Sequence, residues 1–158
     1  MTPDGFFDPA KFPIEVPIRQ CLDATSEEFR HGCQFLGTMA VRGRADAGIF
    51  LLGLLRYHEN DLATATVVVE CLQNFHDARC ADVLVGELRR VPSSNRTRRY
   101  LDAVIRALGR LPSEMVTGRF DDLARDTAFS PRMRAKFASA GSGIAPRWRS
   151  SNDLDDGF

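Results

Sequence analysis

Arginines gather in one stretch of the sequence, between residues 89 and 110. Arg99, Arg106 and Arg110 follow one another at spacings of seven and four residues, which puts three side chains on one face of a helix. A guanidinium presents a planar fork of N–H donors that matches carboxylate and phosphate groups. The spacing therefore predicts a surface that binds an acidic partner, and further arginines crowd the preceding turn: Arg89, Arg90, Arg96 and Arg98.

The same spacing also fits a helix face that is merely solvated. Asp102 falls between Arg99 and Arg106 in the sequence and is placed to pair with its neighbours on that face. Such exposed pairs contribute only tenths of a kcal/mol. The sequence alone leaves both interpretations of the arginines open.

Cysteine and histidine are poorly spaced for a metal site. A site would have to gather Cys71, His76 and Cys80, with Cys33 or His31 added, and none of these form the close ligand pairs typical of zinc sites. The sequence also shows no glycine-rich phosphate loop and no Gly-x-Ser-x-Gly elbow. We therefore assign no catalytic, cofactor-binding or metal-binding residue, and the sequence gives an enzyme no support. The four cysteines are expected to be reduced and mostly buried.

Composition describes a soluble globular chain with balanced charge. The 158 residues include 21 Lys+Arg and 21 Asp+Glu, so any preference for an anionic partner must come from a local patch. The N-terminal stretch lacks the apolar core of a signal peptide, and no apolar run approaches the ~20 residues of a membrane span. We expect a cytoplasmic protein with no membrane role. Lys11 and Lys136 are the only lysines, a bias that hints at a GC-rich bacterial genome.

The elements that must position the arginines are two related segments. Residues 45–75 align with residues 81–111 at an offset of 36, which places Val68 on Val104 and Leu72 on Leu108. Self-similarity at a period of this size is typical of helical-repeat proteins, in which each unit buries its apolar face against the next.

Apolar spacing and capping residues predict six helices and a short seventh. We expect starts at Thr25, which opens a capping box with Glu28, and at Asp61 or Asn60. Glu87 is expected on the polar side of its helix.

Four prolines in residues 1–24 predict an extended arm without a helix, and the polar residues 139–158 predict a disordered tail. The expected helices cover residues 25–42, 45–56, 61–75, 78–91, 96–111, a segment from Ser113, and a short one after Ser130.

This pattern resembles HEAT-type repeats over about residues 25–126. The resemblance rests on the paired helices and on a shared spacing in the second helix of each pair, Val68-Cys71-Leu72-Phe75 and Val104-Ala107-Leu108-Leu111. It implies an all-α fold, a short right-handed α-solenoid of six to seven helices occupying residues 25–138. Related helical-repeat families range from scaffolds to DNA glycosylases.

Two functional hypotheses from different classes follow. The first is a non-enzymatic adaptor that binds an acidic protein through the arginines, through the N-terminal arm, or through the tail that contains Trp148. The alternative is a nucleic-acid-binding or base-processing protein of the HEAT-like glycosylase type, against which the balanced net charge argues. Homo-oligomerisation through the open ends of a short array is a third hypothesis.

Overall fold

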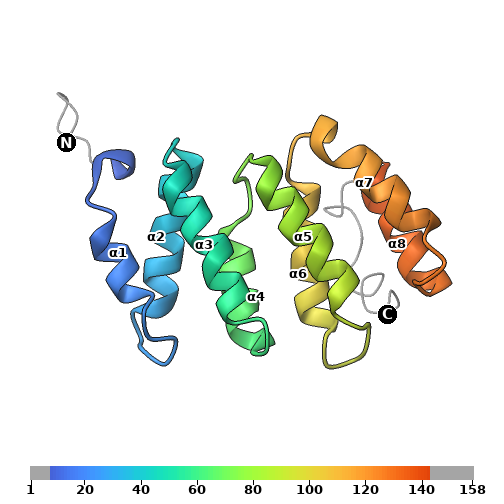
Figure 1. Cartoon of the computed structure of the whole chain (residues 1–158), viewed down its shortest axis with the longest axis horizontal. Helices are drawn as coiled ribbons and strands as arrows, with labels where there is room; N and C mark the ends of the chain where they lie inside the picture. Colours follow the sequence, from blue (N-terminus) through green and yellow to red (C-terminus); the bar gives the residue numbers. More distant parts are fainter. Residues whose placement is uncertain (1–7, 143–158) are drawn as a thin grey trace. The chain divides into compact units, whose positions relative to one another are not determined.

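A computed structural model describes residues 8–142 of the chain (Figure 1). Within this range the protein is all-helical, which confirms the all-α class expected from the sequence. It has eight α-helices, where six to seven were expected, and one short 3-10 turn. No helix in the described range is long and apolar enough to cross a bilayer. The elements are η1 (Pro9–Lys11), α1 (Glu15–Gln20), α2 (Phe29–Val41), α3 (Ala45–Tyr57), α4 (Leu62–Cys71), α5 (Ala78–Arg90), α6 (Arg98–Gly109), α7 (Ser113–Arg125) and α8 (Pro131–Gly141).

The chain divides into two compact units. The N-terminal unit, Met1–His76, contains η1 and α1 to α4, and the C-terminal unit, Asp77–Phe158, contains α5 to α8. Each unit therefore holds two successive helix pairs. The last pair includes α8, which extends to Gly141, so the first residues of the expected tail are helical. Residues 143–158, including Trp148, lie outside the described residues.

The expectation of an extended arm without a helix is wrong for the described part of residues 1–24. α1 contains Pro17 as its third residue, and η1 begins at Pro9. The first residues of a helix have no intrahelical partner for their N–H groups, so proline is tolerated there. Asp8 caps η1 by accepting from the amide of Ala10 at 3.1 Å. The prolines thus mark helix starts.

Capping was predicted well at some helix ends and poorly at others. Asp61 accepts from the amide of Thr64 at 3.3 Å, as a cap of α4 should. Thr25 does not start a helix, because Asp23 accepts from its hydroxyl at 2.6 Å and from its amide at 2.9 Å, which forms a local turn. α2 begins only at Phe29.

Residues that the sequence aligns at an offset of 36 are buried alike. Val68 and Val104 are both 0% exposed, and so are Leu72 and Leu108. Val68 lies in α4 and Leu72 is its C-terminal cap, while Val104 and Leu108 lie in α6; α4 and α6 are the second helices of two successive pairs. Corresponding positions therefore form the core of their own units.

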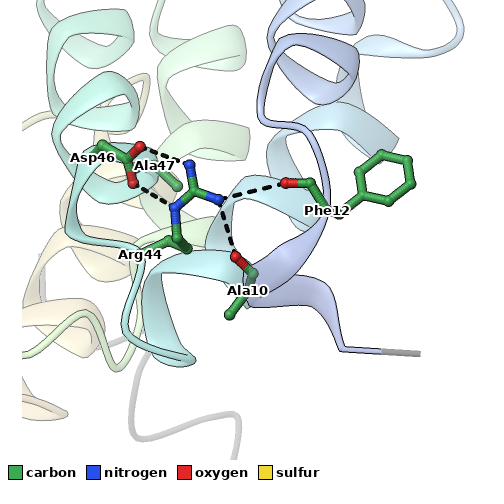
Figure 2. A network of polar contacts seen from close by, with 5 residues as sticks. All are labelled: Ala10, Phe12, Arg44, Asp46 and Ala47. Atoms are coloured by element: carbon green, nitrogen blue, oxygen red, sulfur yellow. Dashed lines mark hydrogen bonds and ion pairs between the residues drawn. The ribbon is translucent and has the colours of Figure 1, made fainter. Parts of the chain in front are cut away.

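Two contacts define the packing of the N-terminal unit. α2 and α4 approach closely at Gly37, where an added Cβ would lie 2.4 Å from the carbonyl oxygen of Cys71. The η1 segment is held to the start of α3 by Arg44 (Figure 2). Its Nη1 donates to the carbonyl oxygens of Ala10 at 2.9 Å and Phe12 at 3.4 Å, while its Nε and Nη2 donate to Asp46 at 3.0 and 2.8 Å.

In the C-terminal unit the first helices of the two pairs, α5 and α7, pack together, and so do the second helices, α6 and α8. α5 contacts α6 and α7, while α8 contacts α6 and α7. Ion pairs join α5 to α7 at two levels, Asp82 with Arg119 and Arg89 with Asp126. This unit positions the arginines that the sequence analysis singled out.

Candidate interaction surface

Four of the predicted arginines are exposed on α6 and in the turn before it. Arg99, Arg106 and the C-terminal cap Arg110 are exposed on the side of α6 that faces away from Val104 and Leu108, and Arg96 is exposed in the α5–α6 loop. Within residues 8–142 none of these four side chains forms an ion pair. We call these four residues the arginine face.

The loop before α6 is fixed by hydrogen bonds of Thr97. Its hydroxyl donates to the carbonyl oxygen of Pro92 at 2.7 Å and accepts from the amide of Ser94 at 2.9 Å. Arg98 donates to the side-chain oxygen of Asn95 at 3.1 Å. Arg96 therefore projects from a loop whose backbone is held in place.

Asp102 does not pair with its arginine neighbours, contrary to one of the sequence interpretations. Lys136 of α8 donates to Asp102 at 2.6 Å, and the two side chains are only 9% and 22% exposed. Asp102 lies on the side of α6 that meets α8, so its carboxylate is directed into the unit. Its carboxylate therefore joins α6 to α8 and does not pair with Arg99 or Arg106.

Arg89 and Arg90 are exposed but are paired with carboxylates of the C-terminal unit, so we do not include them in the arginine face. Arg89 pairs with Asp126, and its guanidinium carbon lies 6.0 Å from the centre of the Phe129 ring. Arg90 donates through Nε and Nη2 to the two oxygens of Glu87, each at 2.8 Å. Both arginines have a structural role here.

Glu87 is a buried carboxylate that the sequence analysis placed wrongly on a polar side. It is only 5% exposed, and the hydroxyl of Tyr100 donates to its Oε1 at 2.5 Å. Burial and the adjacent carboxylate raise the pKa of Tyr100. The alignment at an offset of 36 could have predicted that Glu87 is buried, because it pairs Glu87 with Leu51, which is 0% exposed.

The two units carry opposite net charge. The N-terminal unit has six Lys+Arg against ten Asp+Glu, a net of −4, and the C-terminal unit has fifteen against eleven, a net of +4. The balanced total of the chain conceals this asymmetry. The arginine face therefore belongs to a basic unit, which strengthens its attraction for anions.

The residues considered for a metal site do not come together. Cys71 is partly buried in α4, Cys80 is fully buried in α5, and His76 is exposed. Across residues 8–142 no group of three His, Cys, Asp or Glu side chains is placed to hold a metal ion. Burial raises the pKa of Cys71 to about 11 and that of Cys80 to about 12, so both thiols are protonated at neutral pH.

Comparisons with protein-family models, with curated proteins and with solved structures find no match for this chain.

Proposed function

We propose that this protein is a non-enzymatic adaptor of HEAT-like helical repeats that binds an acidic protein through the arginine face. One observation carries the proposal. Arg96, Arg99, Arg106 and Arg110 are exposed and form no ion pair among the described residues, although acidic side chains of the same unit pair with Arg89, Arg90 and Arg119. Four guanidiniums without counter-charges offer a strong, directional site for carboxylates.

The solenoid is the finer part of the same proposal. It is supported by the pairing of helices and by the contacts of α5 with α7 and of α6 with α8, which are the neighbours expected between successive repeats. In such an array the second helices line one surface. α6 is a second helix, so a partner would meet its arginines on that surface. The arginine-rich composition supports a bacterial source, and we place the protein in the cytoplasm as part of the proposal.

The test compares two charge-reversed variants with equal net charge. Arg99, Arg106 and Arg110 are changed to Glu in one, and the exposed Arg19, Arg42 and Arg56 of the N-terminal unit are changed to Glu in the control. Binding to poly-glutamate is measured at low salt, and captured lysate proteins are compared by quantitative mass spectrometry. We expect the first variant to lose poly-glutamate binding and the captured lysate proteins. The control should keep both. Equal binding by the two variants would refute the arginine face as the site.

Nucleic acid binding is the second candidate, and the +4 net charge of the C-terminal unit favours it. The balanced total charge is a weaker objection once the charge is known to be divided between units. The distinguishing measurement is fluorescence anisotropy with labelled duplex DNA and single-stranded RNA over a range of salt concentrations. Four phosphate contacts from the arginine face predict that the logarithm of the binding constant falls with the logarithm of the salt concentration with a slope of about −3.6 for duplex DNA and about −2.8 for single-stranded RNA. Binding of that kind, lost in the Arg99, Arg106 and Arg110 variant, would replace the adaptor proposal.

Homo-oligomerisation is examined with the same proteins. Light scattering at several concentrations reports whether the chain is a monomer, and the two variants show whether the arginine face takes part in any self-association.

A further inference from the structure

Two buried thiols meet where the first two helices of the N-terminal unit pack together. Cys21 caps the C-terminus of α1, and Cys33 lies in the second turn of α2. Their Sγ atoms are 3.7 Å apart, and the residues are 1% and 0% exposed. Both cysteines are free. This pair has no part in the arginine face.

Gly32 allows the close approach of the two helices that brings the thiols together. A Cβ added at Gly32 would lie 2.9 Å from the Sγ of Cys21 and 2.9 Å from the carbonyl oxygen of Pro17. The end of α1 therefore rests directly on the backbone of α2 beside Cys33. Any larger residue at position 32 would push α1 away and separate the sulfur atoms.

The two thiols lie within hydrogen-bonding distance, and either sulfur can be the donor. The contact with Cys33 lowers the pKa of Cys21, whereas the contact with Cys21 and burial raise the pKa of Cys33. Since the thiolate is the nucleophile in disulfide exchange, Cys21 is suited to attack first and Cys33 to resolve. The Cys71 thiol on α4 raises the pKa of Cys33, and the charge of Arg30 lowers it.

We propose that Cys21 and Cys33 are a dithiol modification site, which a low-molecular-weight disulfide of the glutathione type oxidises to an intramolecular disulfide that fixes α1 on α2. The thiolate of Cys21 attacks one sulfur of the small disulfide, whose S–S bond breaks to release one thiol and leave a mixed disulfide. Cys33 then attacks the sulfur of Cys21 and releases the second thiol. Two protein thiols are oxidised, and one disulfide is reduced to two thiols.

Access to the buried thiols comes from local opening of α1. This helix has only six residues, and its close contacts are with α2. A short helix that packs on one neighbour opens more readily than the unit unfolds. The reaction therefore requires α1 to separate from α2. Once formed, the disulfide prevents α1 from opening again.

The test uses the reduced full-length chain and excess oxidised glutathione. Remaining thiols are blocked, and the chain is cleaved after Arg19, Arg30 and Arg42, which leaves Cys21 on peptide 20–30 and Cys33 on peptide 31–42. We expect these two peptides to be cross-linked in the wild type and in Cys71→Ser, and to separate on treatment with dithiothreitol. Cys21→Ser and Cys33→Ser should not give the cross-link.

Hydrogen exchange supplies a second readout that does not depend on the variants. Oxidation of the wild type should slow exchange of the α1 amides by about tenfold or more, because the disulfide suppresses local opening. A cross-link from Cys33 to Cys71, glutathione adducts without a cross-link, or unreacted thiols after prolonged incubation would each overturn the proposal. So would a cross-link that leaves exchange in α1 unchanged.

Discussion

The hydroxyl of Tyr100 on α6 donates to the carboxylate of Glu87 on α5, with 2.5 Å between the oxygen atoms and both residues buried. Arg90 donates one hydrogen bond to each oxygen of the same carboxylate. A helix pair of the C-terminal unit is thus joined by a buried polar contact where the preceding pair has the apolar Leu51.

Tyr100→Phe should lower the free energy of unfolding by about 1–2 kcal/mol at neutral pH, because Glu87 loses a buried donor. The measurement is urea denaturation followed by circular dichroism. Tyr57→Phe is the matched control, since Tyr57 is 82% exposed and should change stability by less than about 0.5 kcal/mol. Equal effects of the two changes would contradict the role given to the hydroxyl.

Tyr100→Phe should also weaken the dependence of the free energy of unfolding on pH in the alkaline range. The pKa of Tyr100 is raised in the folded state above its ordinary value of 10.0, so the unfolded chain releases this proton first. The contribution of Tyr100 is therefore complete below about pH 10 and is lost as the pH rises further. Denaturation of the wild type between about pH 9 and 11 should show a steeper fall than that of Tyr100→Phe. The thiols with raised pKa values contribute equally to both and cancel in the comparison.

Gly37→Ala should destabilise the N-terminal unit by about 1–3 kcal/mol, because its Cβ would meet the backbone of α4 and force helices apart. The control is Gly53→Ala in α3, where an added Cβ meets nothing within 4 Å. This change should stabilise by about 0.5–1 kcal/mol through the higher helix propensity of alanine. Thermal and urea unfolding measure both, and a neutral result at Gly37 would contradict the close approach of α2 and α4.

Asp102→Ala should cost about 1–3 kcal/mol, since it removes an acceptor from the nearly buried ammonium of Lys136. Lys136→Met should cost less, because it removes the buried charge itself and keeps the aliphatic packing. Urea denaturation of the two variants checks the order. If Lys136→Met proved the more damaging, the pair would matter chiefly through the lysine and not through the helix contact.

Arg44→Ala should release the η1 segment from α3, because it removes the hydrogen bonds to Ala10 and Phe12 shown in Figure 2. We expect faster hydrogen exchange in residues 8–14 and faster tryptic cleavage after Lys11. Arg42→Ala is the control, since Arg42 is exposed on the same loop. Arg44→Lys should resemble the alanine variant, because a lysine cannot reproduce the forked contact with Asp46.

Periodicity predicted the helices of this chain well, because each has to bury an apolar stripe. α4 and α6 were recognised from Val68, Leu72 and their counterparts 36 residues later, and all four are buried. The error at α1 has a local cause. Proline density was interpreted as excluding a helix, although a proline in the first turn breaks no hydrogen bond.

The pairing of side chains was much less predictable than the helices. Asp102 follows Arg99 closely in sequence, yet it pairs with Lys136, which is 34 residues away. Spacing within one helix cannot reveal which side of that helix a neighbouring element covers. The thiol contact of Cys21 with Cys33 was hidden for the same reason, because it depends on how α1 rests on Gly32.

The two ion pairs between α5 and α7 also specify the direction in which α7 runs. On α5 the acid comes first, at Asp82, and the base follows at Arg89; on α7 the order is reversed, with Arg119 followed by Asp126. An inverted α7 would set Arg119 against Arg89 and Asp126 against Asp82. Like charges would then repel at both levels, so the charge order discriminates against the upside-down packing that apolar contacts alone would tolerate.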